Sequence, residues 1–318
     1  MPLIGLLLLI GLSSPLPVQS GKTPCPQGGG TLLQLIIPVV TACPSLDVAY
    51  VASGTTNKLM VMNADTANKA SIFSGARGCQ LFNPSWSPDG KAIAFRNGCD
   101  AFTLWRVDVS VVNGVPKGSN ARRLTAACAS CYDPAWSPTG DVIAVGGGGG
   151  SGSPPLQIPS IFLADANTGA IQTLYTGVAG SLVLYSSWSS DGTRLAVVER
   201  DGSSGLYSIK IVERATGNVL NTLITGVFSG ITHIDWAHGV DKLAITASSP
   251  ATIYTVEIVS QAVTQTVAGN APAWSPDNTK LVFADTSIPS ATIKRLELAT
   301  GTTATLDTSG NYPDWRRF

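Results

Sequence analysis

The chain has 318 residues, with 20 Lys or Arg balanced by 20 Asp or Glu, so its formal net charge is zero. A surface that follows a phosphate backbone needs an excess of basic side chains, so we expect no nucleic acid partner. Charged residues make up only 13% of the chain and glycines number 33, a composition that suits an exported β protein better than a cytosolic one.

The first twenty residues have the pattern of a signal peptide. An apolar stretch at 3–12 is followed by prolines and small residues up to Ser20. Such a stretch is too short to span a bilayer but suits a signal-peptide core, with cleavage expected after Ser20. We therefore expect a signal peptide at 1–20, an N-terminal segment at 21–46, and no membrane span in the mature chain. No Lys or Arg precedes the apolar stretch, so a misplaced start codon or a merely apolar tail remains an alternative.

A tryptophan followed by a tight polar turn and an apolar strand recurs along the rest of the chain. In the first copy, Trp86-Ser87-Pro88-Asp89-Gly90 leads to the apolar run 93–95. Internal repetition decides the fold, and spacings of 38 to 52 residues match one four-stranded propeller blade with its loops. The tryptophans of the series are Trp86, Trp136, Trp188, Trp236, Trp274 and Trp315.

Each repeat predicts four short strands. The tryptophan ends the first strand, and the turn uses proline to set φ, aspartate to cap the turn, and glycine (Asn278 in one copy) to accept a positive φ. The second strand begins seven residues after the tryptophan. Third strands are expected at 103–109, 161–165, 206–212, 253–258 and 293–298, and fourth strands at segments such as 172–175 and 221–224.

The two ends of the repeat region predict how the ring closes. The apolar run 48–50 lacks a tryptophan seven residues earlier, and Trp315 lacks a strand after it. We therefore expect residues 312–317 to supply the innermost strand of a blade whose other strands span 47–74. This gives an all-β, six-bladed β-propeller of four-stranded blades over 47–318. Alternatively, the apolar segment 31–40 forms that inner strand itself, or an extra strand beside the first blade.

The Trp-Ser-Pro-Asp-Gly repeat resembles the TolB-type, WD40-like propeller repeats over about residues 48–317. The resemblance is strong at Trp86, Trp136, Trp188 and Trp274, and weaker at Trp236. It implies the propeller fold and makes a partner in the cell envelope conceivable. TolB carries an additional N-terminal domain, which residues 21–46 are too short to form, and propellers host many unrelated functions.

Six cysteines agree with an oxidising, secreted or periplasmic location. The repeat frame places Cys79 in the loop entering one blade and Cys99 just after that blade's second strand. Both kinds of loop emerge on one face of a propeller, so a Cys79–Cys99 disulfide is expected. Cys128 and Cys131 fall in the next entry loop and are expected to form a disulfide rather than a redox or metal site. Cys25 and Cys43 would close a small loop before the first blade.

Enzyme motifs are scarce. The sequence has no Gly-x-Ser-x-Gly elbow, and no α/β-hydrolase domain follows the repeats. Its two histidines, His233 and His238, are too few for the metal centres of propeller enzymes, so they are expected to be a packed or surface residue and a turn residue. We expect no metal and no cofactor.

The loops of one face carry the candidate binding residues. A ring of mixed charges and aromatic side chains is typical of a propeller that docks a protein or peptide. The alternative for each residue is an ordinary solvated loop position. The candidates in the exit loops are Arg96, Asp100, Glu199, Arg200, Asp201 and Asp285, and those in the entry loops are Arg77, Tyr132, Asp133, Tyr185 and Phe228.

The sequence therefore favours an exported, non-enzymatic, monomeric propeller that binds a protein or peptide at its loop face or channel mouth. The first alternative is a propeller enzyme, a lyase or lactonase-like hydrolase, acting on a carbohydrate or lactone through acidic groups in the central channel. The second is a secreted surface propeller that contacts carbohydrate without catalysis.

Overall fold

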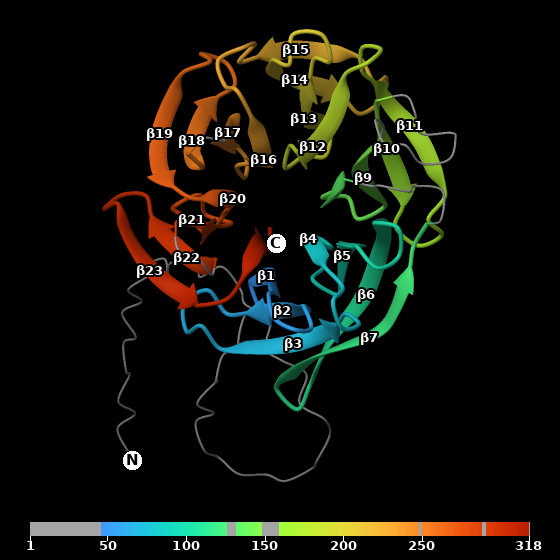
Figure 1. The fold of residues 1–318 in the computed structure, drawn as a ribbon, viewed down its shortest axis with the longest axis vertical. Helices are drawn as coiled ribbons and strands as arrows, with labels where there is room; N and C mark the ends of the chain where they lie inside the picture. Colours follow the sequence, from blue (N-terminus) through green and yellow to red (C-terminus); the bar gives the residue numbers. More distant parts are fainter. Residues whose placement is uncertain (1–45, 126–131, 148–158, 248–249, 288–290, 318) are drawn as a thin grey trace, which may run out of the picture. The chain divides into compact units, whose positions relative to one another are not determined.

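The computed structural model describes residues 46–125, 132–147, 159–247, 250–287 and 291–317. These residues form six antiparallel sheets of four strands each, arranged as blades in a ring around a central axis (Figure 1). Side chains of the inner strands line a pocket at the centre, which we call the channel. In these ranges no helix is long and apolar enough to cross a membrane. The predicted six-bladed all-β propeller is confirmed.

The blades follow the chain, with the innermost strand first in each. The first blade contains β24 (Asn311–Trp315), β1 (Val48–Ala52), β2 (Lys58–Met62) and β3 (Lys69–Ser74), and the second contains β4 (Leu81–Trp86), β5 (Ala92–Asn97), β6 (Thr103–Val112) and β7 (Val115–Arg123). The third contains β8 (Tyr132–Trp136), β9 (Val142–Gly147), β10 (Ser160–Asp165) and β11 (Ile171–Thr176), and the fourth contains β12 (Leu182–Trp188), β13 (Arg194–Arg200), β14 (Tyr207–Glu213) and β15 (Val219–Leu223). The fifth contains β16 (Ile231–Trp236), β17 (Lys242–Ala247), β18 (Thr252–Glu257) and β19 (Val263–Ala268), and the sixth contains β20 (Asn270–Trp274), β21 (Lys280–Asp285), β22 (Thr292–Glu297) and β23 (Thr302–Asp307).

The ring closes through its first blade. Strand β24 pairs antiparallel with β1, with Val48 opposite Trp315 and Ala49 opposite Asp314. The predicted closure by the C-terminal strand is therefore confirmed. Residues 31–40, the alternative source of an inner or extra strand, lie outside the described residues. This pairing gives β1 the neighbour that the inner edge of the first blade would otherwise lack.

The tryptophans hold neighbouring blades together. All six end an inner strand and are at most 6% exposed. Trp236 of the fifth blade, for example, shares a core cluster with Ile209 and Ile211 of the fourth blade. One isolated blade would leave both faces of its sheet exposed to water, so these contacts between blades make up the core.

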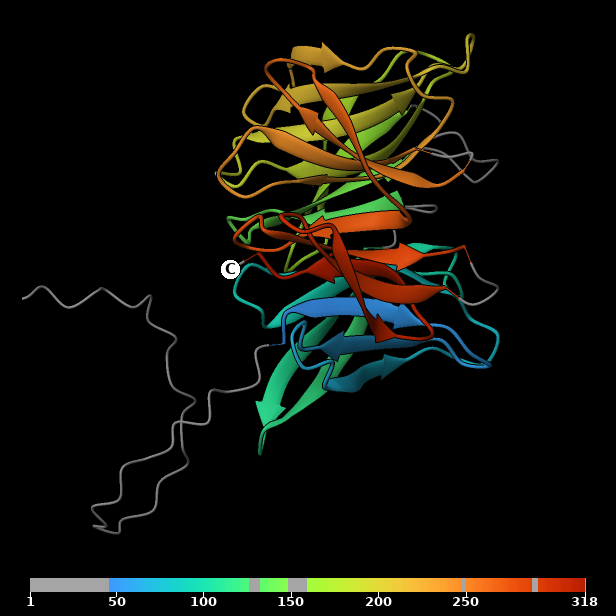
Figure 2. The same cartoon turned by 90° about the vertical axis from the view of Figure 1, so that its left-hand side faces the viewer.

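The turns after the tryptophans form as predicted. Ser87 Oγ donates to the Asp89 carboxylate at 2.7 Å, and Gly90 N donates to Ser87 O at 2.9 Å, with Gly90 at φ 68°. These turns lie with the C-terminus on one face of the ring, which we call the turn face (Figure 2). The opposite face, which carries the loops entering each blade, is called the entry face.

Cysteine pairing is resolved for one pair. Cys79 and Cys99 form the predicted disulfide, which joins the entry loop of the second blade to the loop after β5. Cys25, Cys43, Cys128 and Cys131 lie outside the described residues, and their expected disulfides remain predictions.

Candidate functional site

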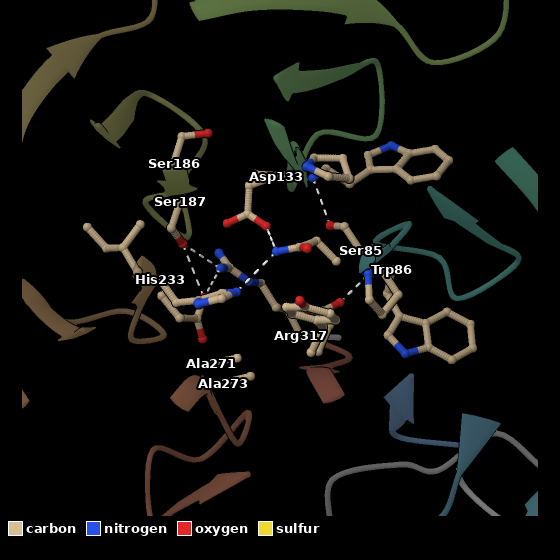
Figure 3. A pocket seen from close by; sticks show the side chains of 18 of the residues that line it. Ser85, Trp86, Asp133, Ser186, Ser187, His233, Ala271, Ala273 and Arg317 are labelled. Atoms are coloured by element: carbon tan, nitrogen blue, oxygen red, sulfur yellow. Dashed lines mark hydrogen bonds and ion pairs between the residues drawn. The ribbon is translucent and has the colours of Figure 1, made fainter. Parts of the chain in front are cut away.

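A bulge in each inner strand builds the wall of the channel. In most inner strands the residue three positions before the tryptophan has a positive φ, such as 48° at Asn83 and 54° at Tyr312, and the register with the second strand shifts there. A bulge re-aims a side chain, here toward the axis of the ring. The residues at this position are Asn83, Asp133, Tyr185, His233, Ala271 and Tyr312. All but Tyr185 line the channel pocket, where Figure 3 labels Asp133, His233 and Ala271, and Tyr185 packs against His233.

These side chains contact one another across the channel. The Asn83 amide donates to the Asp133 carboxylate, and its nitrogen lies 3.1 Å from His233 Nε2. The imidazole of His233 packs between Tyr185 and Tyr312, with ring centroids 5.2 and 5.7 Å apart. Inner strands of five blades thus meet through one polar and aromatic layer.

A second layer, two positions further along, links each blade to the next. Ser85 Oγ accepts a hydrogen bond from the backbone N–H of Trp136 at 2.9 Å, although these residues belong to different blades. Ser187, Asp235 and Asp314 accept from the Trp236, Trp274 and Trp86 N–H groups in the same way, at 2.8–2.9 Å. Because the inner strands have no further sheet neighbour, these side chains satisfy N–H groups that would otherwise face the channel.

The C-terminus enters the channel from the turn face. Arg317 forms an ion pair with Asp235, donates to Ser187 Oγ at 2.8 Å, and donates to the Trp188 carbonyl at 2.9 Å. Its guanidinium therefore spans from the first blade, where the chain ends, to the fourth and fifth (Figure 3).

Burial changes the ionisation of the channel groups. It raises the pKa of the Asp133 carboxyl well above its usual range, and the nearby Arg96 opposes this only in part. Burial also raises the pKa of Asp314 to about 7 and lowers the pKa of His233 to about 4. Burial thus shifts Asp133 toward its protonated form and favours the uncharged form of His233 at neutral pH.

Arg96 lies at the mouth of the channel on the entry face, within a cluster of aromatic rings that we call the aromatic mouth. Its guanidinium carbon is 4.4, 5.0 and 5.2 Å from the ring centroids of Phe102, Tyr132 and Phe82. Phe82 in turn packs against Tyr312 of the channel layer at 5.8 Å. Ala101 and Phe102 have φ values of 49° and 57°, an uncommon conformation for such residues that aims Phe102 at the arginine.

The structure brings four of the predicted binding residues together. Arg96 and Tyr132 form the aromatic mouth, and Asp133 and Tyr185 lie directly below it in the channel.

The other predicted residues have different surroundings. Asp100 accepts from Thr103 Oγ1 and Trp105 Nε1, and Asp201 and Asp285 cap their own turns. Glu199 is buried, paired with Lys210 at 2.7 Å and with Tyr175. Phe228 packs against Tyr254, while Arg77 is exposed in the loop that leads to Cys79 and Arg200 lies at the end of β13.

Sequence reasoning missed several residues of this site: Phe82, Asn83, Phe102, His233 (taken as a packed or surface residue), Tyr312 and Arg317. For Asn83, His233 and Tyr312 the signal was the fixed offset from the tryptophan, which aligns the other five channel positions with Asp133. No such offset marks Phe82, Phe102 or Arg317. Among the residues that the structure describes, no group of three or more His, Cys, Asp or Glu side chains could hold a metal ion.

Comparison with known proteins supports the fold. No family model and no curated sequence matches the chain. TolB from Acinetobacter baumannii superposes with a TM-score of 0.64 at 16% identity over 86% of this chain and 67% of that one. A chain assigned as TolB in Agrobacterium tumefaciens gives 0.62 at 17% identity, covering 84% and 91%.

A chain of a nidogen/laminin complex also matches, with a TM-score of 0.64 at 10% identity over 85% of this chain and 98% of that one. Structural matches at sequence identities this low support the fold but do not indicate the function. On this evidence the chain is a six-bladed β-propeller with the fold of the TolB propeller domains.

Proposed function

We propose that this protein is an exported, non-enzymatic propeller that binds a protein or peptide at the aromatic mouth of its channel. The observation that carries the proposal is the cluster of Phe82, Phe102 and Tyr132 around Arg96. Phe102 is 37% exposed although it is a large apolar residue. Aromatic side chains and arginine are the residue types that dominate binding energy at protein interfaces.

The size of the channel favours binding at the mouth over chemistry inside. The channel pocket has a volume of ≈ 70 Å³, enough for a few water molecules. Pockets that enclose small organic ligands usually have volumes of about 300–1,000 Å³. A carbohydrate or lactone would therefore need a wider channel than these side chains leave, whereas a peptide could lie across the mouth and insert one side chain.

Two further observations support export and protein binding. The Cys79–Cys99 disulfide suits an oxidising compartment, as does the expected signal peptide. One of the matched structures is of nidogen with laminin, so a similar fold occurs in a complex between proteins. We propose a secreted or periplasmic location and a monomeric state.

A peptide display selection tests the function. The full chain, produced by export so that its disulfides form, is immobilised and challenged with a library of random twelve-residue peptides. Selected peptides are expected to bind the wild type and to lose at least about tenfold in affinity for Phe102→Ala/Tyr132→Ala, which removes two interface anchors.

The matched control is Val259→Ala, because Val259 is 84% exposed in a turn of the fifth blade away from the mouth. Peptides that bind the double variant as tightly as the wild type would place the binding surface elsewhere. Turnover of lactone or oligosaccharide substrates by the wild type, lost in the Asp133→Asn variant, would support the enzymatic alternative instead.

A further inference from the structure

Arg96 is a half-buried cation enclosed by aromatic rings. It makes no hydrogen bond or ion pair with any residue that the structure describes, and its Nε is shielded from water without an acceptor. Burial lowers the pKa of Arg96. A guanidinium has five N–H donors in a planar fork, and leaving them unpaired in a partly dry site costs free energy.

The aromatic rings compensate for this only in part. Cation–π contacts attract the guanidinium to the faces of Phe82, Phe102 and Tyr132. They hold the guanidinium in place but cannot accept its N–H groups in the plane of the fork. The rings thus fix the orientation of Arg96 and leave its hydrogen-bonding capacity for a ligand.

Little in the surroundings of Arg96 compensates its charge. Asp133, the carboxyl group with which Arg96 interacts electrostatically, forms no ion pair with it, accepts a hydrogen bond from Asn83, and has a pKa raised by burial. The other groups near Arg96 are the side chains of Tyr132, Tyr185 and Tyr312, and burial raises the pKa of Tyr185 and Tyr312. Asp235 at the other end of the channel is already paired with Arg317. The aromatic mouth is therefore a positive site with an apolar rim.

From this geometry we infer that the aromatic mouth recognises a carboxylate, which accepts hydrogen bonds from the Arg96 guanidinium while Phe82, Phe102 and Tyr132 surround the pair. The inference rests on the proposed peptide-binding function and specifies the chemical group of the peptide that the site recognises. A carboxylate matches the guanidinium fork with two parallel hydrogen bonds. The rings exclude water around the pair, which lowers the local dielectric constant and strengthens it.

The carboxylate can come from an acidic side chain or from the C-terminus of a peptide, and two pairs of small probes separate these sources. N-acetyl-aspartate amide is compared with N-acetyl-asparagine amide, and N-acetyl-phenylalanine with its amide. The arginine Nε–Hε signals of ¹⁵N-labelled full-length protein are followed by NMR, with the Arg96 signal assigned from Arg96→Lys. Saturable shifts of the Arg96 signal are expected with one or both carboxylates and not with the amides.

Two variants supply the matched comparison. Arg96→Gln removes the charge and is expected to weaken carboxylate binding at least about tenfold. Arg77→Gln removes an exposed arginine of the same face and is expected to leave binding unchanged. Arg96 bonds to no described residue, so Arg96→Gln should fold, which its circular dichroism spectrum and melting curve verify. Equal shifts of many arginine signals, or equal responses to the amide probes, would overturn the inference.

The peptides from the display selection keep the two proposals separate. Selected peptides that bind wild type and Arg96→Gln equally well, and that tolerate replacement of every carboxylate by an amide, would refute carboxylate recognition and leave peptide binding standing. If neither selected peptides nor carboxylate probes bind, both proposals fail.

Discussion

Arg317, the penultimate residue of the chain, forms an ion pair with Asp235 at the end of strand β16, in the fifth blade. The chain has by then completed the first blade with β24, so this contact ties the C-terminus to the far side of the ring. The closing strand and the ion pair therefore act at different places. The strand seals the edge of one blade, and Arg317 joins that blade to two others through the channel.

Replacing Arg317 with alanine should destabilise the propeller. The substitution leaves the Asp235 carboxylate, which is 8% exposed, without its charged partner. Removing one member of a buried pair costs about 3–5 kcal/mol, and we expect about 2–3 because the Arg317 side chain is 17% exposed. Urea unfolding followed by tryptophan fluorescence measures the loss.

Arg316→Ala is the control, because Arg316 donates only a 3.3 Å side-chain hydrogen bond to the Asp89 carbonyl. This variant should lose less than about 1 kcal/mol. Equal losses for the two variants would mean that the channel contact adds nothing to closure.

The serine that links the second and third blades gives a second prediction. Ser85→Ala removes the acceptor of the Trp136 N–H and should cost about 1–2 kcal/mol, because that donor is left unpaired. Ser186→Ala is the matched control: Ser186 is equally an inner-strand serine, but its buried hydroxyl has no partner among the described residues. It should be neutral or slightly stabilising. A control variant as unstable as Ser85→Ala would contradict the role given to the hydrogen bond.

The tryptophan spacing was sufficient to predict the fold. Each tryptophan fills the same position between two blades, and the turn after it requires the same residue types, so selection for packing leaves a repeated pattern. The same logic predicted closure, since Trp315 and the run at 48–50 are the two halves of one repeat. It also placed Cys79 and Cys99 on one face, which led to the correct disulfide.

The site was only partly predictable, because its residues share positions and not residue types. The channel layer contains Asp133, His233 and Ala271 at equivalent positions of the repeats. Because these residue types differ, the layer cannot be recognised in the sequence from a repeated residue type. Phe102 reaches Arg96 because Ala101 and Phe102 adopt positive φ values. Neither residue type predicts this backbone conformation. Arg317 lies beyond the last repeat, and its position depends on the closed ring.

The disulfide gives a third prediction. Cys79 and Cys99 are separated by 20 residues, and cross-linking a loop of that length stabilises a protein by about 3 kcal/mol through the unfolded state. The Cys79→Ala/Cys99→Ala variant should therefore unfold at a lower urea concentration than the wild type when both are oxidised. Each protein is also measured after reduction, where the difference between them should shrink. A difference that survives reduction unchanged would point to lost packing of Cys79, which is buried, and not to the cross-link.

Asp314 gives the final prediction, which concerns pH. Its pKa is raised from 3.8 to about 7 in the folded protein, chiefly by burial, with Asp235 adding to the shift and Arg317 and the Trp86 N–H opposing it. Between about pH 4 and pH 7 the folded chain keeps a proton that the unfolded chain has released. The contribution of Asp314 to the free energy of unfolding is therefore lowest above pH 7, and it rises as the pH falls toward 4.

Asp314→Asn keeps an oxygen for the Trp86 N–H but cannot ionise. Relative to the wild type it should gain stability as the pH rises from 5 to 8, by on the order of 2 kcal/mol, since water in the channel reduces the full effect of the shift. Asp277→Asn is the control, because its carboxyl has a pKa lowered to about 2 and is ionised throughout this range in both states. Its difference from the wild type should be constant with pH. Urea unfolding at four pH values measures both, and a flat difference for Asp314→Asn would show that this carboxyl ionises normally in the channel.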